Sequence, residues 1–141
     1  MAPAEKDYSA TPLSKKFGIK VDSRVMSLGA PRSFPKLLGK LPRGAKLTNW
    51  EEEADVIVLF TQKRSDLRKW FSNAKKSLEP SGRLWVAYPK KTSKLPTDLT
   101  FEVVQELGLQ AGLVDNKSCA IDDDWSGVQF VYRLKDRPKT R

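Results

Sequence analysis

The sequence predicts a three-layer α/β domain whose sheet is mostly parallel and closes with a C-terminal antiparallel hairpin. Two apolar runs, Val56–Phe60 and Leu84–Tyr88, contain no alternating polar residues. Strands of this kind have both faces covered, which is typical of parallel strands between two layers of helices. Near the C-terminus, Val128–Leu134 alternates instead, which is typical of an edge strand with one exposed face.

Helix and turn signals place the elements of the first half of the chain. Thr11 suits a helix cap, Pro12 the first position of that helix and Gly18 its end. Gly39 suits the end of a second short helix. The predicted elements, in chain order, are the helix Thr11–Gly18, the strand Arg24–Leu28, a short helix around Pro35–Leu38, a short strand at Ala45–Thr48 and the strand Asp55–Phe60.

An amphipathic helix is predicted between the two apolar runs. Ser65 suits its cap, Asp66 is favourable in its first turn, and the helix runs to about Leu78. Glu79–Gly82 contains a proline and a glycine, so we expect it to break the helix and form a turn before the strand Arg83–Tyr88. The two sides of the helix differ, with an apolar stripe of Leu67, Trp70, Phe71, Ala74 and Leu78 opposite a basic face of Arg68, Lys69, Lys75 and Lys76.

The last third of the chain is predicted to add one helix and two strands. Thr97-Asp98 opens the helix, which continues through Leu107 until Gly108 stops it. The strands are Leu113–Ile121 and Val128–Leu134, joined by a turn at Asp122–Gly127. With Arg24–Leu28, Asp55–Phe60 and Arg83–Tyr88 as inner parallel strands, the elements form one domain over residues 11–134. A flexible arm (1–10) precedes it and a basic tail (135–141) follows.

Composition removes several classes of function. The chain has 141 residues, enough for one domain with its own core. It contains no histidine, which excludes Ser–His and Cys–His nucleophilic pairs, histidine metal sites and histidine general bases. A single cysteine, Cys119, excludes an internal disulfide and favours a reducing, cytoplasmic setting. No apolar run reaches the roughly 18–20 residues of a membrane span, so we expect no membrane partner and no signal peptide.

The net charge of +9 is unevenly distributed. Residues 14–46 carry nine basic groups against one acid, and residues 61–94 carry ten against two. Residues 95–132 reverse the balance, with seven acids and only Lys117. Such a distribution favours an anionic partner on one side, either a small molecule or nucleic acid. The alternative is a charged surface that only keeps the protein in solution.

Basic residues follow several of the predicted parallel strands. Because the carboxyl ends of such strands meet at one edge of the sheet, this edge is the expected ligand site. A phosphate or a carboxylate could bind at this edge to Lys90, Lys91 and the amide groups at Thr97–Leu99. The alternatives are a solvated loop, or anion attraction by the basic helix face without any pocket. The candidate anion site consists of Gly29, Arg32, Lys63, Arg64, Lys90, Lys91 and Thr97.

Three other features are assigned structural roles. Asp122–Asp124 lacks the spacing of a calcium loop, so a turn is favoured over a metal site. Cys119 lies on a predicted strand with only Lys117 nearby, which favours an inert thiol over a nucleophile. Trp50 and Trp125 could stack on a base or a partner, but packing is favoured. We therefore predict no catalytic residue and no metal.

Two segments carry a resemblance to a known fold. Asp55–Leu59 looks like the fourth strand of class I S-adenosylmethionine-dependent methyltransferases, and Leu78–Leu84 like the entry into their fifth. The resemblance implies a Rossmann-like, methyltransferase-like sheet with about one strand–helix unit missing between Gly39 and Asp55. The family's functional residues do not carry over. The glycine-rich loop falls on Leu28–Arg32, which keeps one glycine, and Glu51 is the carboxylate nearest the position of the ribose-binding acid. The motif after the fourth strand is replaced by Phe60-Thr61-Gln62.

A closer resemblance covers nearly the whole chain. Its motifs resemble an uncharacterised bacterial domain-of-unknown-function family, which implies no activity. They are Tyr8–Lys16, Leu28–Pro31, Trp85–Lys91, Pro96–Thr100 and Gly112–Asp115. The favoured hypothesis is a non-catalytic binding module on a degenerate methyltransferase-like scaffold, taking an anionic ligand or partner and no cofactor. The alternatives are a small S-adenosylmethionine-dependent methyltransferase and a nucleic-acid-binding protein. A protein partner or a homo-oligomer stays open.

Overall fold

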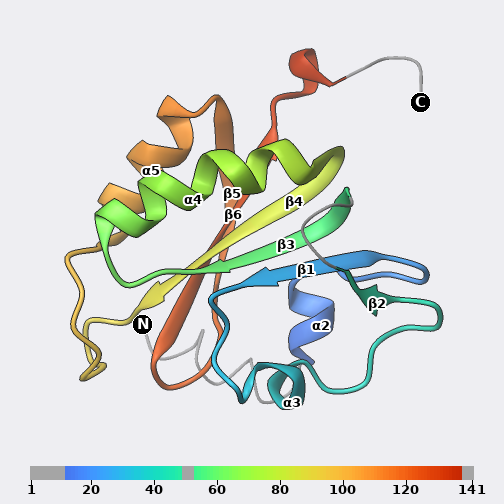
Figure 1. Cartoon of the computed structure of the whole chain (residues 1–141), viewed down its shortest axis with the longest axis horizontal. Coiled ribbons are helices and arrows are strands. Elements are labelled where there is room, and N and C mark those ends of the chain that lie inside the picture. The colour runs from blue at the N-terminus through green and yellow to red at the C-terminus, as the bar shows by residue number, and fades with distance from the viewer. Residues whose placement is uncertain (1–11, 49–52, 138–141) are drawn as a thin grey trace.

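A six-stranded mixed sheet runs through the molecule, and helices cover both of its faces (Figure 1). The structure is a computed structural model that describes residues 12–48 and 53–137. The strand order is β2-β1-β3-β4-β6-β5, in which β2, β1, β3 and β4 are parallel and β6 is antiparallel to both neighbours. The strands are β1 (Arg24–Leu28), β2 (Lys46–Leu47), β3 (Ala54–Phe60), β4 (Leu78–Pro89), β5 (Leu113–Ala120) and β6 (Trp125–Tyr132).

This topology confirms the predicted fold class and its three inner parallel strands, because β1, β3 and β4 each lie between two others. Among the described residues, no helix has the length and apolarity to cross a membrane. Some predictions fall outside the described residues: the arm 1–10, the cap Thr11, Trp50, Glu51 and the tail beyond residue 137. A short 3₁₀ turn, η1 (Leu134–Asp136), joins the predicted domain to the described part of that tail.

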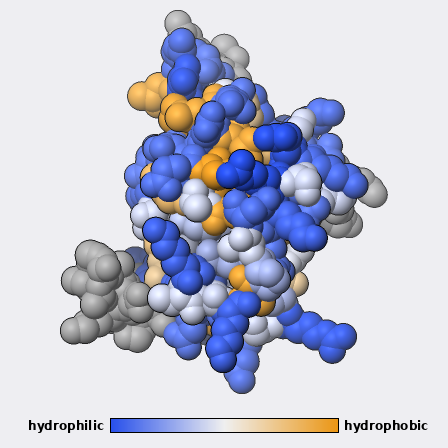
Figure 2. Space-filling model, turned by 90° about the vertical axis from the view of Figure 1, so that its left-hand side faces the viewer, coloured by the Kyte–Doolittle hydropathy of each residue, from blue (hydrophilic) through white to orange (hydrophobic). Residues whose placement is uncertain are grey.

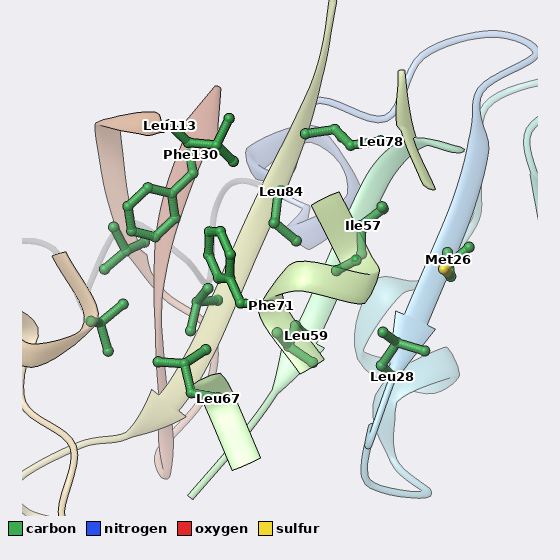
Figure 3. Packing of buried hydrophobic residues seen from close by; sticks show 14 of the residues in the cluster. Met26, Leu28, Ile57, Leu59, Leu67, Phe71, Leu78, Leu84, Leu113 and Phe130 are labelled. Atoms are coloured by element: carbon green, nitrogen blue, oxygen red, sulfur yellow. The ribbon is translucent and has the colours of Figure 1, made fainter. Parts of the chain in front are cut away.

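Two separate apolar clusters fill the layers above and below the sheet. One joins the sheet to α4 (Arg64–Ser77) and α5 (Phe101–Gln110), and the other joins it to α2 (Leu13–Lys16) and α3 (Phe34–Leu38). Figure 3 shows Phe71 of α4 pointing toward Phe130 of β6, with ring centroids 5.6 Å apart in an edge-to-face arrangement. Ile57 belongs to the first cluster and Val58 to the second. Both faces of β3 are therefore buried, which explains why its sequence does not alternate.

The predicted turn at Glu79–Gly82 is wrong. β4 begins at Leu78, directly after the last residue of α4, and the segment runs on as strand. Its pairing with β3 shifts register between Ala54 and Val56. Gly82 allows β3 to approach, because a Cβ there would lie 2.5 Å from the carbonyl oxygen of Asp55. Here the proline and the glycine lie in an irregular part of a strand. The turn signals of the local sequence alone had predicted a break.

The C-terminal strand is not at the edge of the sheet, contrary to the alternating pattern. β6 lies between β4 and β5, and β5 forms the edge. The alternation misled because Gln129 is 2% exposed, and its amide nitrogen donates to Asn116 Oδ1 at 2.7 Å. From the sequence, a buried polar residue with such a partner cannot be distinguished from an exposed polar residue.

The starts and ends of the two long helices also differ from the prediction. α5 begins at Phe101 rather than at Thr97-Asp98, because Thr100 Oγ1 accepts from the amide of Val103 and caps it. Gly108 lies inside this helix, where any Cβ would collide with the Phe130 ring. α4 begins at Arg64, so Ser65 is not its cap.

Candidate ligand-binding site

The carboxyl ends of β1, β3 and β4 lie at one edge of the molecule, on the left in Figure 1. Figure 2 looks onto this side, where hydrophilic side chains surround smaller hydrophobic areas. Gly29 follows β1, Thr61 follows β3 and Lys90 follows β4. The edge contains two groups of hollows, one beside β4 and α5 and the other between β1 and β3.

The first, which we term the β4–α5 hollow, has a volume of about 850 Å³. It lies between the end of β4, the segment leading to α5, the first turn of α5 and the facing ends of β5 and β6. Its walls combine basic, acidic, hydroxyl and apolar groups, among them Lys90, Lys91, Glu102, Ser93, Ser118, Ser126, Tyr88 and Phe101. The space is large enough for a small organic molecule.

The electrostatics of this hollow combine two lysines and the first turn of α5, which favour an anion, with the Glu102 carboxylate, which opposes one. The amides of Phe101 and Glu102 are in the first turn of α5 and have no acceptor within the helix. They therefore form the positive end of the dipole of α5. Lys91 is exposed at the rim. Burial, and to a lesser degree the Glu102 carboxylate, raises the pKa of Tyr88. The Tyr88 phenol therefore stays protonated and can donate a hydrogen bond at neutral pH.

Four hydrogen bonds tie the start of α4 to the segment before α5, and we term them the clasp. The amide of Arg64 donates to Asp98 Oδ1 at 2.8 Å, and Arg64 Nε donates to the Asp98 carbonyl at 3.3 Å. The Thr97 hydroxyl donates to the Gln62 carbonyl at 2.6 Å, and Gln62 Nε2 donates to the Pro96 carbonyl at 3.0 Å. Asp98 thus caps α4 from a distant part of the chain, which Ser65 was predicted to do locally.

The structure does not bring all the predicted site residues together. Lys90, Lys91 and Thr97 line the β4–α5 hollow, and Gly29 lines the hollows between β1 and β3. Arg32, Lys63 and Arg64 line none of these hollows. Chain direction placed them at the correct edge, but this edge is three strands wide. Of the residues that were expected to attract an anion, Arg64 and Thr97 make the clasp.

Two adjoining hollows of about 480 and 470 Å³ lie between the ends of β1 and β3, and we term them the β1–β3 hollows. They share Gly29, Phe60, Thr61 and Asp66. Trp70 lines only the first, whereas Asp122, Asp124 and Trp125 line only the second. No lysine or arginine is among their lining residues. Their charge is therefore opposite to the one that the sequence predicted for this edge.

Thr61 follows β3 at the predicted ligand edge, but it was not among the candidate site residues. Its side chain is 5% exposed, and its Oγ1 has no hydrogen-bond partner among the described residues. The available signal was its place directly after β3, at the carboxyl end of a parallel strand. Gly29 at the end of β1 has φ 68°, and a Cβ there would lie 2.8 Å from the Phe60 carbonyl oxygen. Only glycine therefore lets β1 end this close to β3.

Of the residues assigned structural roles, Cys119, Asp122 and Trp125 have them in the structure, and Trp50 lies outside the described residues. Burial raises the pKa of Cys119 to about 11, against a smaller opposite effect of Lys16, so the thiol is a poor nucleophile. Asp122 Oδ1 accepts from the amides of Asp124 and Trp125, as expected of a turn. Trp125 packs edge-to-face on Phe60 with centroids 5.0 Å apart. Within residues 12–48 and 53–137, no group of three or more histidine, cysteine or acidic side chains could hold a metal ion.

Comparison with known proteins supports the fold and a family. A sequence model described as protein of unknown function (DUF3052) matches residues 43–134. Among proteins of curated function, none matches the chain significantly in sequence.

Several solved methyltransferases have a similar structure. A SAM dependent methyltransferase from Aquifex aeolicus aligns over 84% of this chain and 86% of its own, with a TM-score of 0.61 and 14% identity. Magnesium protoporphyrin IX methyltransferase from Synechocystis PCC 6803 with bound SAH aligns over 93% and 82%, with a TM-score of 0.57 and 8% identity. DhpI in complex with SAH aligns over 100% and 89%, with a TM-score of 0.59 and 9% identity. At these identities the likeness establishes the methyltransferase-like fold alone.

Proposed function

The chain belongs to the DUF3052 family, and on that premise we propose that it is a non-catalytic binding module that takes an anionic ligand in the β4–α5 hollow. The observation that carries the proposal is the position of Lys90 and Lys91 in one hollow with the first turn of α5. Lysine ammonium groups and unpaired helix amides are both favourable to a phosphate or carboxylate group.

The walls of this hollow support a ligand that has an organic part as well as an anionic group. Phe101 is 37% exposed although it is aromatic, and it lines the hollow together with Leu95 and Leu99. The hydroxyls of Ser118 and Ser126 lie on the opposite wall, on β5 and β6. An apolar surface with a few polar groups is typical of small-molecule sites.

The chemistry at this edge supports binding rather than catalysis. The sequence has no histidine, and Cys119 in the wall of the hollow keeps its proton at neutral pH. Tyr88 is likewise protonated, because burial raises its pKa. None of these groups is a ready base or nucleophile.

The main alternative is a S-adenosylmethionine-dependent methyltransferase, which the shared fold favours. Against it, the segment after β1 is Gly29-Ala30-Pro31, with one glycine where that fold's cofactor loop has several. We therefore expect no micromolar binding of S-adenosylmethionine in calorimetry. A second alternative is nucleic-acid binding by the exposed basic face of α4, which holds Arg68, Lys69 and Lys76.

Two double variants, each of which removes two positive charges, distinguish anion binding in the β4–α5 hollow from anion binding by the basic face of α4. Inorganic pyrophosphate is the probe, titrated by calorimetry at two salt concentrations. We expect Lys90→Ala with Lys91→Ala to weaken its binding about tenfold, because the charge pairs that a defined site makes are lost. Lys69→Ala with Lys76→Ala should change it less than twofold.

Each alternative has its own outcome. If both double variants weaken pyrophosphate binding equally and binding depends steeply on salt, the site in the hollow is refuted and binding by the basic surface is favoured. Binding of S-adenosylmethionine with a micromolar dissociation constant would refute the binding module in favour of the methyltransferase. Thermal unfolding of all variants checks the fold, because neither lysine pair lies in an apolar cluster.

A further inference from the structure

We propose that the β1–β3 hollows bind a second ligand, a small organic cation whose ammonium group donates to Thr61 and is paired with Asp66. The inference concerns a different place and the opposite charge from the anion site beside α5. It starts from three observations on the same hollows: their charge, an unpartnered buried hydroxyl, and their aromatic walls.

The charge of these hollows is opposite to the net charge of the chain. The protein has a net charge of +9, yet three carboxylates and no lysine or arginine line the hollows. Asp66 lies in both, whereas Asp122 and Asp124 lie only in the one beside Trp125. A concave, acidic place in a basic protein concentrates cations locally.

The Thr61 hydroxyl supplies the observation that is independent of charge. Thr61 lines both hollows, is 5% exposed, and its Oγ1 has no partner among the described residues. Its amide is used, because it donates to the Ala87 carbonyl at 3.0 Å. A buried hydroxyl without a partner is unfavourable, and an N–H donor on a ligand would remove that penalty.

The walls favour an organic cation over an inorganic one. Trp70 lines one hollow and Trp125 the other, with Leu28 and Leu59 nearby. The Lys69 ammonium already lies 5.2 Å from the centroid of the Trp70 ring, so the cation is expected beside Trp125 rather than on Trp70. Indole rings attract cations that have lost part of their hydration shell. A divalent metal would need several converging carboxylates, and no such group exists in the described part of the chain. Asp122 Oδ1 already accepts from two backbone amides.

An ammonium group with N–H bonds is preferred to a quaternary one. Oγ1 of Thr61 can only accept from a group that carries a proton, and a carboxylate such as Asp66 also accepts. A primary ammonium has three donors and can satisfy both at once. Putrescine and its bis(trimethylammonium) analogue are therefore suitable probes, because both carry two positive charges but only putrescine has N–H donors.

The test measures putrescine binding by calorimetry in buffer with salt near physiological concentration, using the full chain. We expect Thr61→Val, which keeps the shape of the side chain, and Asp66→Asn each to weaken binding at least fivefold. Asp136→Asn removes the same charge on the exposed turn η1 and should change binding less than twofold. The bis(trimethylammonium) analogue should bind at least fivefold more weakly than putrescine.

Several results would overturn the proposal. They are the absence of putrescine binding, equal weakening by Asp66→Asn and Asp136→Asn, and binding of the bis(trimethylammonium) analogue as tight as that of putrescine. Micromolar binding of S-adenosylmethionine that is lost in Thr61→Val would also overturn it, by assigning the hollows to a nucleoside cofactor. The Lys90 and Lys91 double variant should leave putrescine binding intact. The proposal for this site and the proposal for the anion site are therefore tested independently.

Discussion

The two ends of the parallel strands use their polar groups differently. At the amino end, Asp55 accepts from the amide of Arg24 at 2.8 Å and from its guanidinium at 3.2 and 3.1 Å. Glu79 lies 3.9 Å from the same guanidinium. At the carboxyl end, Thr61 Oγ1 has no partner among the described residues, and lysines and carboxylates line hollows instead.

This difference indicates where the fold allows function. The amino ends of the strands are closed by an ion pair that links β1, β3 and the start of β4. The carboxyl ends are followed by loops, and in open α/β sheets that is where ligands bind. Polar groups at the amino end should therefore stabilise the protein, whereas some at the carboxyl end should serve a ligand at the expense of stability.

The largest effect expected from this comparison is that of Asp55→Ala. It leaves the Arg24 amide and guanidinium without their main acceptor. We expect the free energy of unfolding to fall by about 2 kcal/mol, a value that allows for solvent reaching part of this carboxylate. Urea denaturation measures the change.

Asp98→Ala is the matched control at the other end. Asp98 also accepts from an arginine amide, but it is exposed, so water can replace it. We expect a loss of about 0.5–1 kcal/mol, as for other helix caps. A loss at Asp98 as large as the one at Asp55 would contradict the proposed difference between the two ends.

The same ion pair predicts a dependence of stability on pH. Burial raises the pKa of Asp55, but hydrogen bonds from the Arg24 side chain and amide outweigh this, so its pKa lies below the ordinary 3.8. The unfolded chain therefore takes up the proton first as pH falls. The stabilisation is complete above the ordinary pKa and is lost as pH falls through the lower, folded value.

Melting temperatures of the wild type and of Asp55→Asn, from about pH 6 to about pH 2, test this sign. The gap between the two proteins should be constant near neutral pH and should narrow in acid. A gap that widens as pH falls would show that Asp55 is not the stabilised carboxylate.

One expected effect has the opposite sign. Thr61→Val replaces an unpartnered hydroxyl by a methyl group of similar size, so the free energy of unfolding should rise by about 1 kcal/mol. Thr97→Val is the matched control, because the Thr97 hydroxyl donates to Gln62 and accepts from the amide of Leu99. Its loss should lower stability by about 1 kcal/mol. A similar loss in Thr61→Val would mean that Thr61 has a partner after all.

Most of the fold could be predicted from local sequence, but several boundaries could not. The apolar stripe of α4 predicted its buried face, since Leu67, Phe71 and Ala74 are all buried. The position of β6 inside the sheet was missed, because burial of Gln129 depends on Asn116, thirteen residues away. The cap of α4 was missed for the same reason, since Asp98 is distant in sequence from Arg64.

For the candidate site too, some features could be predicted from the sequence and others could not. Sequence by itself determined the α/β class, the three inner parallel strands and the edge at which their carboxyl ends meet, because these follow from apolar periodicity and chain direction. Only the tertiary structure decided what that edge contains. The clasp uses Arg64 and Thr97, and Lys90 and Lys91 lie beside α5. Acids of the turn between β5 and β6 line the same hollow as Gly29 and Thr61. Side chains from distant segments set the sign of the local charge, and residue order along the chain does not specify which of them meet.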